Sequence, residues 1–171
     1  MWQFNGNQRP SFASEPQPGQ ESVWDYPRPP AVVPDDRDIE VRLGQVVLAK
    51  TSAAIRILET ASPPTFYLPP GDVDWAYLVA SSGSSFREWK GAATYWSVQV
   101  GDLLVKNAGW GYTRPRDRFR QISGYISFYP SRLECFVDGE RVRPQPGGFY
   151  GGWITDEIIG PVKGEPGTGQ W

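Results

Sequence analysis

The chain has 171 residues, with 19 glycines, 17 prolines and eight each of Trp, Tyr and Phe, but no histidine and a single cysteine. The lack of histidine excludes a Ser-His-Asp or Cys-His nucleophile and an HExxH zinc site. One cysteine without histidine excludes an internal disulfide and a tetrahedral structural zinc site. The 17 basic and 19 acidic residues leave a net charge of −2, so no broad basic surface for nucleic acid is expected.

Two segments of biased composition enclose the middle of the chain. Residues 1–34 are rich in proline and residues 144–171 in glycine, which predicts extended arms without a core of their own. Their aromatic rings indicate that the arms dock, the second on the domain itself and the first on the domain or on a partner. Met1–Gly6 lacks the basic and apolar stretches of a signal peptide, and no apolar run is long enough for a membrane span. We therefore expect a cytoplasmic protein without membrane insertion.

Residues 35–143 are predicted to form a β domain. Ile39–Thr51 alternates around a Gly-Gln pair, which predicts a first hairpin. Ala54–Glu59 predicts a third strand. Prolines on both sides of Thr65–Leu68 restrict that segment to an edge strand or an extended loop.

The rest of the domain continues the same pattern. Asp72–Tyr77 is the expected helical turn, and Asp138-Gly139 is typical of the type I′ turn that closes a hairpin. Short strands at regular spacing, with hardly a helical window, predict an all-β sandwich or open barrel. The further strands are expected at Trp75–Ala80, Ala92–Val100, Leu103–Lys106, Ser123–Tyr129 and Leu133–Val137.

Alternation along two of these strands suggests a cleft. In Ala92–Val100, alternate residues from Thr94 onward form an apolar core face, which puts Tyr95 on the opposite face. Such polar faces either line a hydrogen-bonding cleft or form the wet outer face of an antiparallel sheet. In Ser123–Tyr129 the face opposite the apolar one consists of Tyr125, Ser127 and Tyr129.

Three further features have a functional and a structural interpretation. Lys90, just before a strand, is an anion or carbonyl binder beside Tyr95, or an edge lysine that prevents aggregation. Cys135 shares the apolar face of its strand, which indicates a buried, inert thiol. The Asp-Val-Asp sequence at residues 72–74 has no Gly-Ser turn before it, and the chain has no phosphate-binding loop. We therefore expect no metal site and no cofactor.

Five strings along the sequence are distinctive in combination. They are VWDYPRPP from Val23, RILET from Arg56, EWKG from Glu88, VDGE from Val137 and GGFYGGWIT from Gly147. Together they resemble the bacterial domain of unknown function 427 family, and the resemblance covers nearly the whole chain. It implies a β-tent-like fold, in which two antiparallel sheets lean together as an open sandwich around a cleft. The family is sometimes labelled nucleotidyltransferase-like, a label that the motifs above do not support.

The residues do not name a reaction, so three functional hypotheses remain open. The first is a non-catalytic module that binds a small molecule or a protein in an aromatic, lysine-lined cleft. The second is an assembly subunit docked through its arms, and the third is an enzyme that uses Lys90, Glu59 and tyrosines as acid and base. The candidate ligand-binding residues are Arg56, Glu59, Tyr67, Lys90, Tyr95, Trp110, Tyr125 and Tyr129.

Overall fold

The computed structural model describes residues 1–171 and confirms the all-β class. Its helices are short 3₁₀ turns, and none has the length and apolar composition needed to cross a membrane. The elements are β1 (Glu21–Ser22), η1 (Val23–Asp25), β2 (Ala31–Asp35), β3 (Ile39–Leu43), β4 (Val46–Thr51), β5 (Ala54–Leu58), β6 (Thr65–Tyr67), η2 (Pro70–Asp72), η3 (Trp75–Tyr77), β7 (Leu78–Arg87), β8 (Gly91–Val100), β9 (Leu103–Gly111), η4 (Asp117–Ile122), β10 (Ile126–Phe128), β11 (Glu134–Val137), β12 (Glu140–Arg141), β13 (Arg143–Pro144), β14 (Trp153–Ile154) and β15 (Ile158–Ile159).

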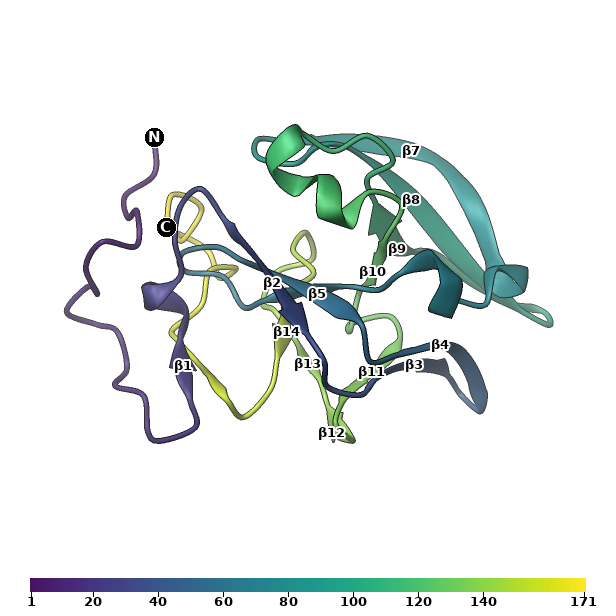
Figure 1. Ribbon diagram of the computed structural model, residues 1–171, viewed down its shortest axis with the longest axis horizontal. Coiled ribbons are helices and arrows are strands. Elements are labelled where there is room, and N and C mark those ends of the chain that lie inside the picture. Colours follow the sequence, from purple (N-terminus) through teal and green to yellow (C-terminus); the bar gives the residue numbers. More distant parts are fainter.

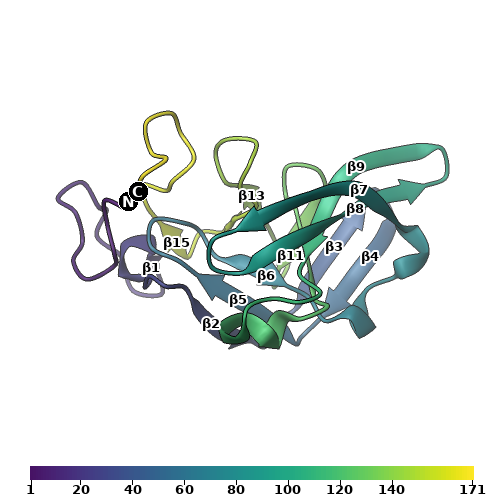
Figure 2. The same cartoon turned by 90° about the horizontal axis from the view of Figure 1, so that it is seen from above.

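The strands form three larger antiparallel sheets and two small pairs. The larger sheets have the orders β10-β9-β8-β7, β12-β11-β3-β4 and β2-β5-β6. Leu68 and Ile126 exchange backbone hydrogen bonds of 2.8 and 3.0 Å, which join the edge strand β6 to β10. The β7–β9 sheet is inclined above β2 and β5 (Figure 1), and the tip of the β7–β8 hairpin extends over β5 and β6 (Figure 2).

The strongest local signals of the sequence are confirmed. The first hairpin forms, with Ile39 opposite Thr51 and Leu43 opposite Val46. The Asp-Gly turn links β11 to β12 with positive φ at both residues, as a type I′ turn requires. Cys135 is fully buried, and burial raises the pKa of its thiol, which makes a reactive thiolate unfavourable.

The alternation predicted for β8 is confirmed from Trp96 onward and fails at Thr94. Val98 is fully buried, and Trp96 and Val100 pack beside it on the same core cluster, whereas Thr94 is exposed. The register shift between Trp96 and Val98 leaves the extra residues on β9, so β8 keeps its period of two. The opposite face, with Ala93 and Tyr95, packs on a second buried cluster.

For Ser123–Tyr129, the interpretation as a wet outer face is wrong, because β10 is covered on both sides. Ile126 and Phe128 pack into the largest core cluster, which has 17 buried residues and includes Cys135. Tyr129 packs into a second layer, which we call the aromatic cluster, and Ser127 is fully buried. The aromatic cluster consists of Ile55, Ile57, Tyr67, Ala93, Trp110, Tyr112, Phe119, Ile122 and Tyr129.

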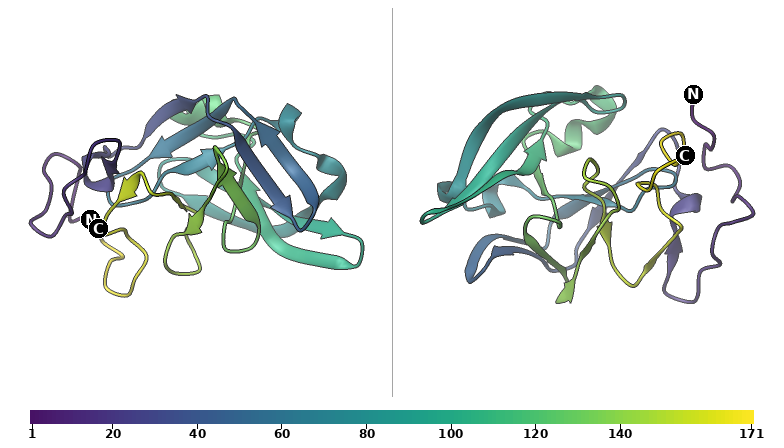
Figure 3. Two further views of the ribbon diagram at one scale, coloured as in Figure 1. Left: turned by 90° about the horizontal axis from the view of Figure 1, so that it is seen from below. Right: turned by 180° about the vertical axis from the view of Figure 1, so that it is seen from behind.

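The first and last parts of the chain lie side by side, with both marked ends on one side of the molecule (Figure 3). β1 pairs in parallel with β15, and the Gln3 N–H donates a 2.7 Å hydrogen bond to the Gln170 carbonyl. Four rings close this contact, with centroids 5.1–5.9 Å apart, and we call it the clasp. The clasp rings are Phe4, Phe12, Trp24 and Trp171. The division into arms and a β domain stays a prediction.

Candidate functional site

A cavity of about 240 Å³ lies beneath the tip of the β7–β8 hairpin. Its floor is the end of β5, β6 and the facing part of β9, which contribute Ile57, Tyr67 and Trp110. The hairpin tip contributes Arg87 and Lys90. Further lining residues come from both ends of the sequence and include Trp2, Gln145, Phe149, Tyr150 and Lys163.

The aromatic floor is fixed by contacts beneath it. The Trp110 indole N–H donates a 3.3 Å hydrogen bond to the Tyr67 hydroxyl, and their rings meet edge to face at 6.1 Å. Burial raises the pKa of the neighbouring Tyr112, which therefore stays a neutral phenol. A Cβ on Gly151 would lie 2.2 Å from Trp110 Cη2, so only glycine lets the chain cross that ring. The floor is apolar and closely packed.

Three cations line the cavity without a carboxylate partner. Arg87, Lys90 and Lys163 all border it. None of them takes part in the ion pairs of the protein. The Arg87 guanidinium carbon instead lies 4.1 Å from the Phe149 ring centroid. The indole N–H of Trp89, another lining residue, is buried without an acceptor. These groups leave positive charge and a hydrogen-bond donor unsatisfied around one space.

Lys163 is the most deeply buried of these cations, at 3% exposure. Its Nζ lies 4.1 Å from the Trp2 ring centroid and 5.2 Å from that of Tyr150. Desolvation lowers the pKa of Lys163, and the nearby charges of Glu59 and Glu88 only partly oppose this. Its backbone N–H donates to the Ala61 carbonyl at 2.8 Å, which fixes the segment while the amine enters the cavity.

The two carboxylates of the cavity wall are already engaged. Glu59 accepts a 3.2 Å hydrogen bond from Arg28, whose side chain is 3% exposed. Glu88 accepts a 3.2 Å hydrogen bond from the indole N–H of Trp2. The Arg28 guanidinium carbon also lies 4.1 Å from the Trp2 ring centroid. Trp2 thus joins the hairpin tip, the β5 end and the last segment of the chain.

The structure brings half of the sequence-predicted residues to this cavity. Glu59, Tyr67, Lys90 and Trp110 line it. The other four are not among its lining residues. Tyr129 belongs to the aromatic cluster, Tyr95 and Tyr125 pack against that cluster, and Arg56 belongs to an ion network. A binding role for all eight stays a prediction.

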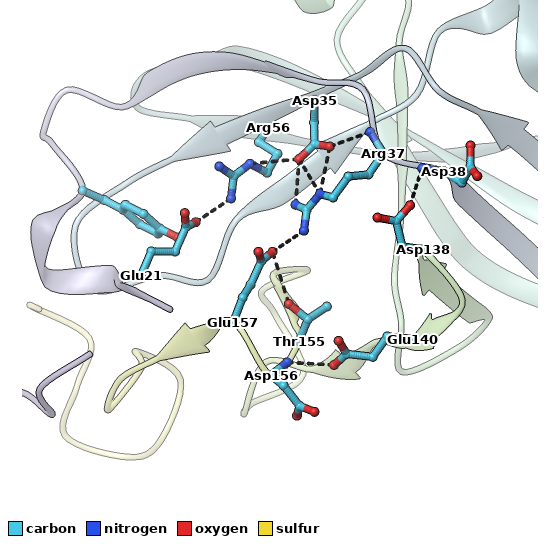
Figure 4. A network of polar contacts seen from close by, with 11 residues as sticks. Glu21, Asp35, Arg37, Asp38, Arg56, Asp138, Glu140, Thr155, Asp156 and Glu157 are labelled. Carbon is cyan, nitrogen blue, oxygen red and sulfur yellow. Dashed lines mark hydrogen bonds and ion pairs between the residues drawn. The ribbon is translucent and has the colours of Figure 1, made fainter. Parts of the chain in front are cut away.

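Arg56 directly precedes the cavity residue Ile57 in β5, so its side chain points to the opposite face of the strand. There it joins a network of ion pairs (Figure 4). Its side chain pairs with Glu21 at 2.5 Å and with Asp35 at 3.3 Å. Arg37 extends the network by bridging Asp35 and Glu157, each at 2.7 Å. These two guanidinium groups and three carboxylates pair with one another and fasten β1, β2 and β5 to the approach to β15.

A family model described as domain of unknown function 427 matches residues 31–139, which is more than half of the sequence. The chain belongs to this family. The search of curated proteins finds no match. The DUF427 region holds Glu59, Lys90 and Trp110, whereas Trp2 and Lys163 lie outside it. The family's matched region therefore makes the floor and hairpin wall of the cavity, and the flanking segments complete the enclosure.

The cavity residues that the flanking segments supply are not among the sequence-predicted ones. Trp2, Tyr150 and Lys163 lie in stretches without periodicity, where strand parity gives no direction. The available signal for these segments is their aromatic residues among glycines and prolines. A linker exposed to solvent would not bury such rings, so they indicate that the segments pack on other parts of the protein. Arg87 carries no signal beyond its place just before the EWKG string.

No group of three or more acidic or cysteine side chains is placed to hold a metal ion. The Asp-Val-Asp pair has structural partners instead. Asp72 accepts a 2.7 Å hydrogen bond from the Thr51 hydroxyl, and Asp74 accepts one of 3.2 Å from the Ala76 N–H at the start of η3. These carboxylates fix the turn between β6 and β7.

Proposed function

We propose that the protein is a binding module for a small planar anion, which occupies the cavity beneath the β7–β8 hairpin. The observation that carries the proposal is the presence of three cations without carboxylate partners, Arg87, Lys90 and Lys163, around an aromatic floor. The negative charge of the ligand pairs with these cations, and the ring of the ligand packs on Trp110 and Tyr67.

The size of the cavity sets the size of the ligand. Its volume of about 240 Å³ is below the ~300–1,000 Å³ of sites for drug-sized ligands. One ring with a carboxylate or phosphate group therefore fits better than a peptide or a dinucleotide. The hypotheses of an assembly subunit and of an acid–base enzyme have no comparable observation in their favour, since the rings of the clasp pack on one another.

Calorimetric titration with phenyl phosphate and benzoate, against neutral benzyl alcohol, tests the proposal. We expect the two anions to bind and the alcohol to bind at least about tenfold more weakly, because a hydrogen bond to a charged group contributes ~1.5–3 kcal/mol. Arg87→Gln should weaken anion binding by a similar factor. Arg118→Gln is the matched control, because Arg118 is exposed and outside the cavity.

Two results would contradict the proposal. One is equal binding of the neutral alcohol and the anions, which would remove the role of charge. The other is an equal effect of Arg87→Gln and Arg118→Gln, which would place the anion elsewhere on the surface. The melting temperature of each variant shows whether the fold is intact.

A further inference from the structure

Lys163 has an environment that a purely structural lysine does not need. Its side chain is 3% exposed, yet its amine borders the cavity and has no hydrogen-bond or ion-pair partner. Most buried polar groups are hydrogen-bonded, and exceptions often mark functional groups. Two aromatic rings, Trp2 and Tyr150, lie beside the amine, which faces the cavity.

We infer that Lys163 is the nucleophile of a carbonyl-binding site and forms an imine with an aldehyde or ketone that carries an acid group. This inference rests on the proposed function, because the acid group is the anion held by Arg87 and Lys90. It adds the position of a second group of the ligand, the carbonyl, next to Lys163 Nζ. Desolvated lysines are the usual source of Schiff bases with carbonyl substrates.

The reaction needs no oxidant, reductant or metal. The lone pair of neutral Nζ attacks the carbonyl carbon, and a proton passes from the resulting ammonium nitrogen to the carbonyl oxygen to give a carbinolamine. The carbinolamine then loses water, and a C=N bond joins the ligand to Lys163. The lowered pKa of Lys163 supports this step because only the neutral amine is nucleophilic. Water and the imine are the only products.

The probe is 4-formylbenzoate, which has a ring, a carboxylate and an aldehyde, with sodium cyanoborohydride added to reduce the imine. The chain has four lysines, at positions 50, 90, 106 and 163, so peptide mass spectrometry assigns each label. We expect Lys163 to be labelled at least roughly tenfold faster than the exposed Lys50 and Lys106, because a bound, oriented reactant gains effective concentration. Benzaldehyde, which has no carboxylate, should label Lys163 no faster than Lys50 and Lys106.

Controls separate this inference from the proposed function. Terephthalate has the same ring and carboxylate without the aldehyde, so its calorimetric binding reports on the anion site alone. If terephthalate binds but Lys163 is labelled no faster than Lys50 and Lys106, the imine is excluded and the anion site stands. If terephthalate does not bind and Lys163 is not labelled faster, the anion site and the imine are both wrong. Lys163→Met should abolish the fast label, whereas Lys106→Met should leave it unchanged, and the wild-type comparison holds even if Lys163→Met folds poorly.

Discussion

The Asp35 carboxylate binds two arginines, Arg37 and Arg56. It accepts hydrogen bonds from the Arg37 side chain at 2.7 and 3.0 Å and from the Arg37 backbone N–H at 3.0 Å, and it pairs with Arg56. Burial raises the pKa of Asp35, but the hydrogen bonds and charge of Arg37, with the charge of Arg56, hold it below its ordinary value of 3.8. Folding is therefore linked to ionisation of this carboxylate.

We predict that Asp35→Asn lowers the free energy of unfolding by about 3 kcal/mol at neutral pH, as expected when a buried ion pair loses one partner. The folded-state pKa is the lower one, so the contribution of the charge is complete above the ordinary value near 3.8 and is lost as the pH falls through the folded-state pKa. The difference in free energy of unfolding between the protein and its Asp35→Asn variant should therefore narrow below about pH 4. Urea unfolding against pH measures it, with the exposed Asp36→Asn as control. A deficit independent of pH would contradict the role of the charge.

At the scale of the element, β9 decides whether the cavity floor exists. It carries Trp110 into the floor, and it approaches β10 so closely that two of its residues are glycine. A Cβ on Gly111 would lie 2.5 Å from the Tyr125 carbonyl oxygen, a backbone atom that cannot turn away. The spacing between β9 and β10, and with it the position of Trp110, depends on this missing side chain.

We predict that Gly111→Ala destabilises the protein by about 1–3 kcal/mol, the usual result of overpacking. Gly83→Ala is the matched control, because Gly83 lies in β7 of the same sheet, has no positive φ, and leaves the place of an added methyl group free of other atoms within 4 Å. Thermal unfolding of both variants gives the comparison. Equal melting temperatures would show that β9 and β10 can separate without loss.

At the scale of the whole molecule, the clasp makes segments from both ends of the sequence part of one structure. Phe12 stacks on Trp171 at 5.1 Å and 23°, and Trp24 meets both rings edge to face. Trp24 belongs in turn to a buried cluster with Leu58 of β5. The β sheets and the flanking segments therefore share an apolar interior.

We predict that Phe12→Ala and Trp171→Ala are coupled by about 0.5–1.5 kcal/mol, the range of aromatic pairs in double-mutant cycles. The double variant should therefore lose less stability than the two single losses added together. A cycle between Phe12 and the exposed Phe149, which do not touch, should be additive. Additivity in the first cycle as well would show that the Phe12–Trp171 stack contributes no interaction energy.

Local patterns in the sequence were enough for much of the fold but for only part of the site. The hairpin from Ile39 and the burial of Cys135 follow from a period of two, which is read within a few residues. The register shift at Trp96 depends on pairing with β9, so no local pattern contains it. Lys163 reaches the cavity through long-range packing against Trp2, and charge alone gives no sign of that.

The contact between Gln3 and Gln170 has a consequence for the order in which the protein opens. Joining residues so far apart in sequence closes a long loop, whose entropy cost grows with length. We expect such a contact to form after the sheets and to open before β3–β5 and β7–β10 lose their pairing. Since Trp2 is both next to this contact and part of the cavity wall, we expect opening of the contact to open the cavity wall as well. Entry of the proposed ligand would then require only that the clasp loosens, and a ligand bound there would hold the two ends of the fold together.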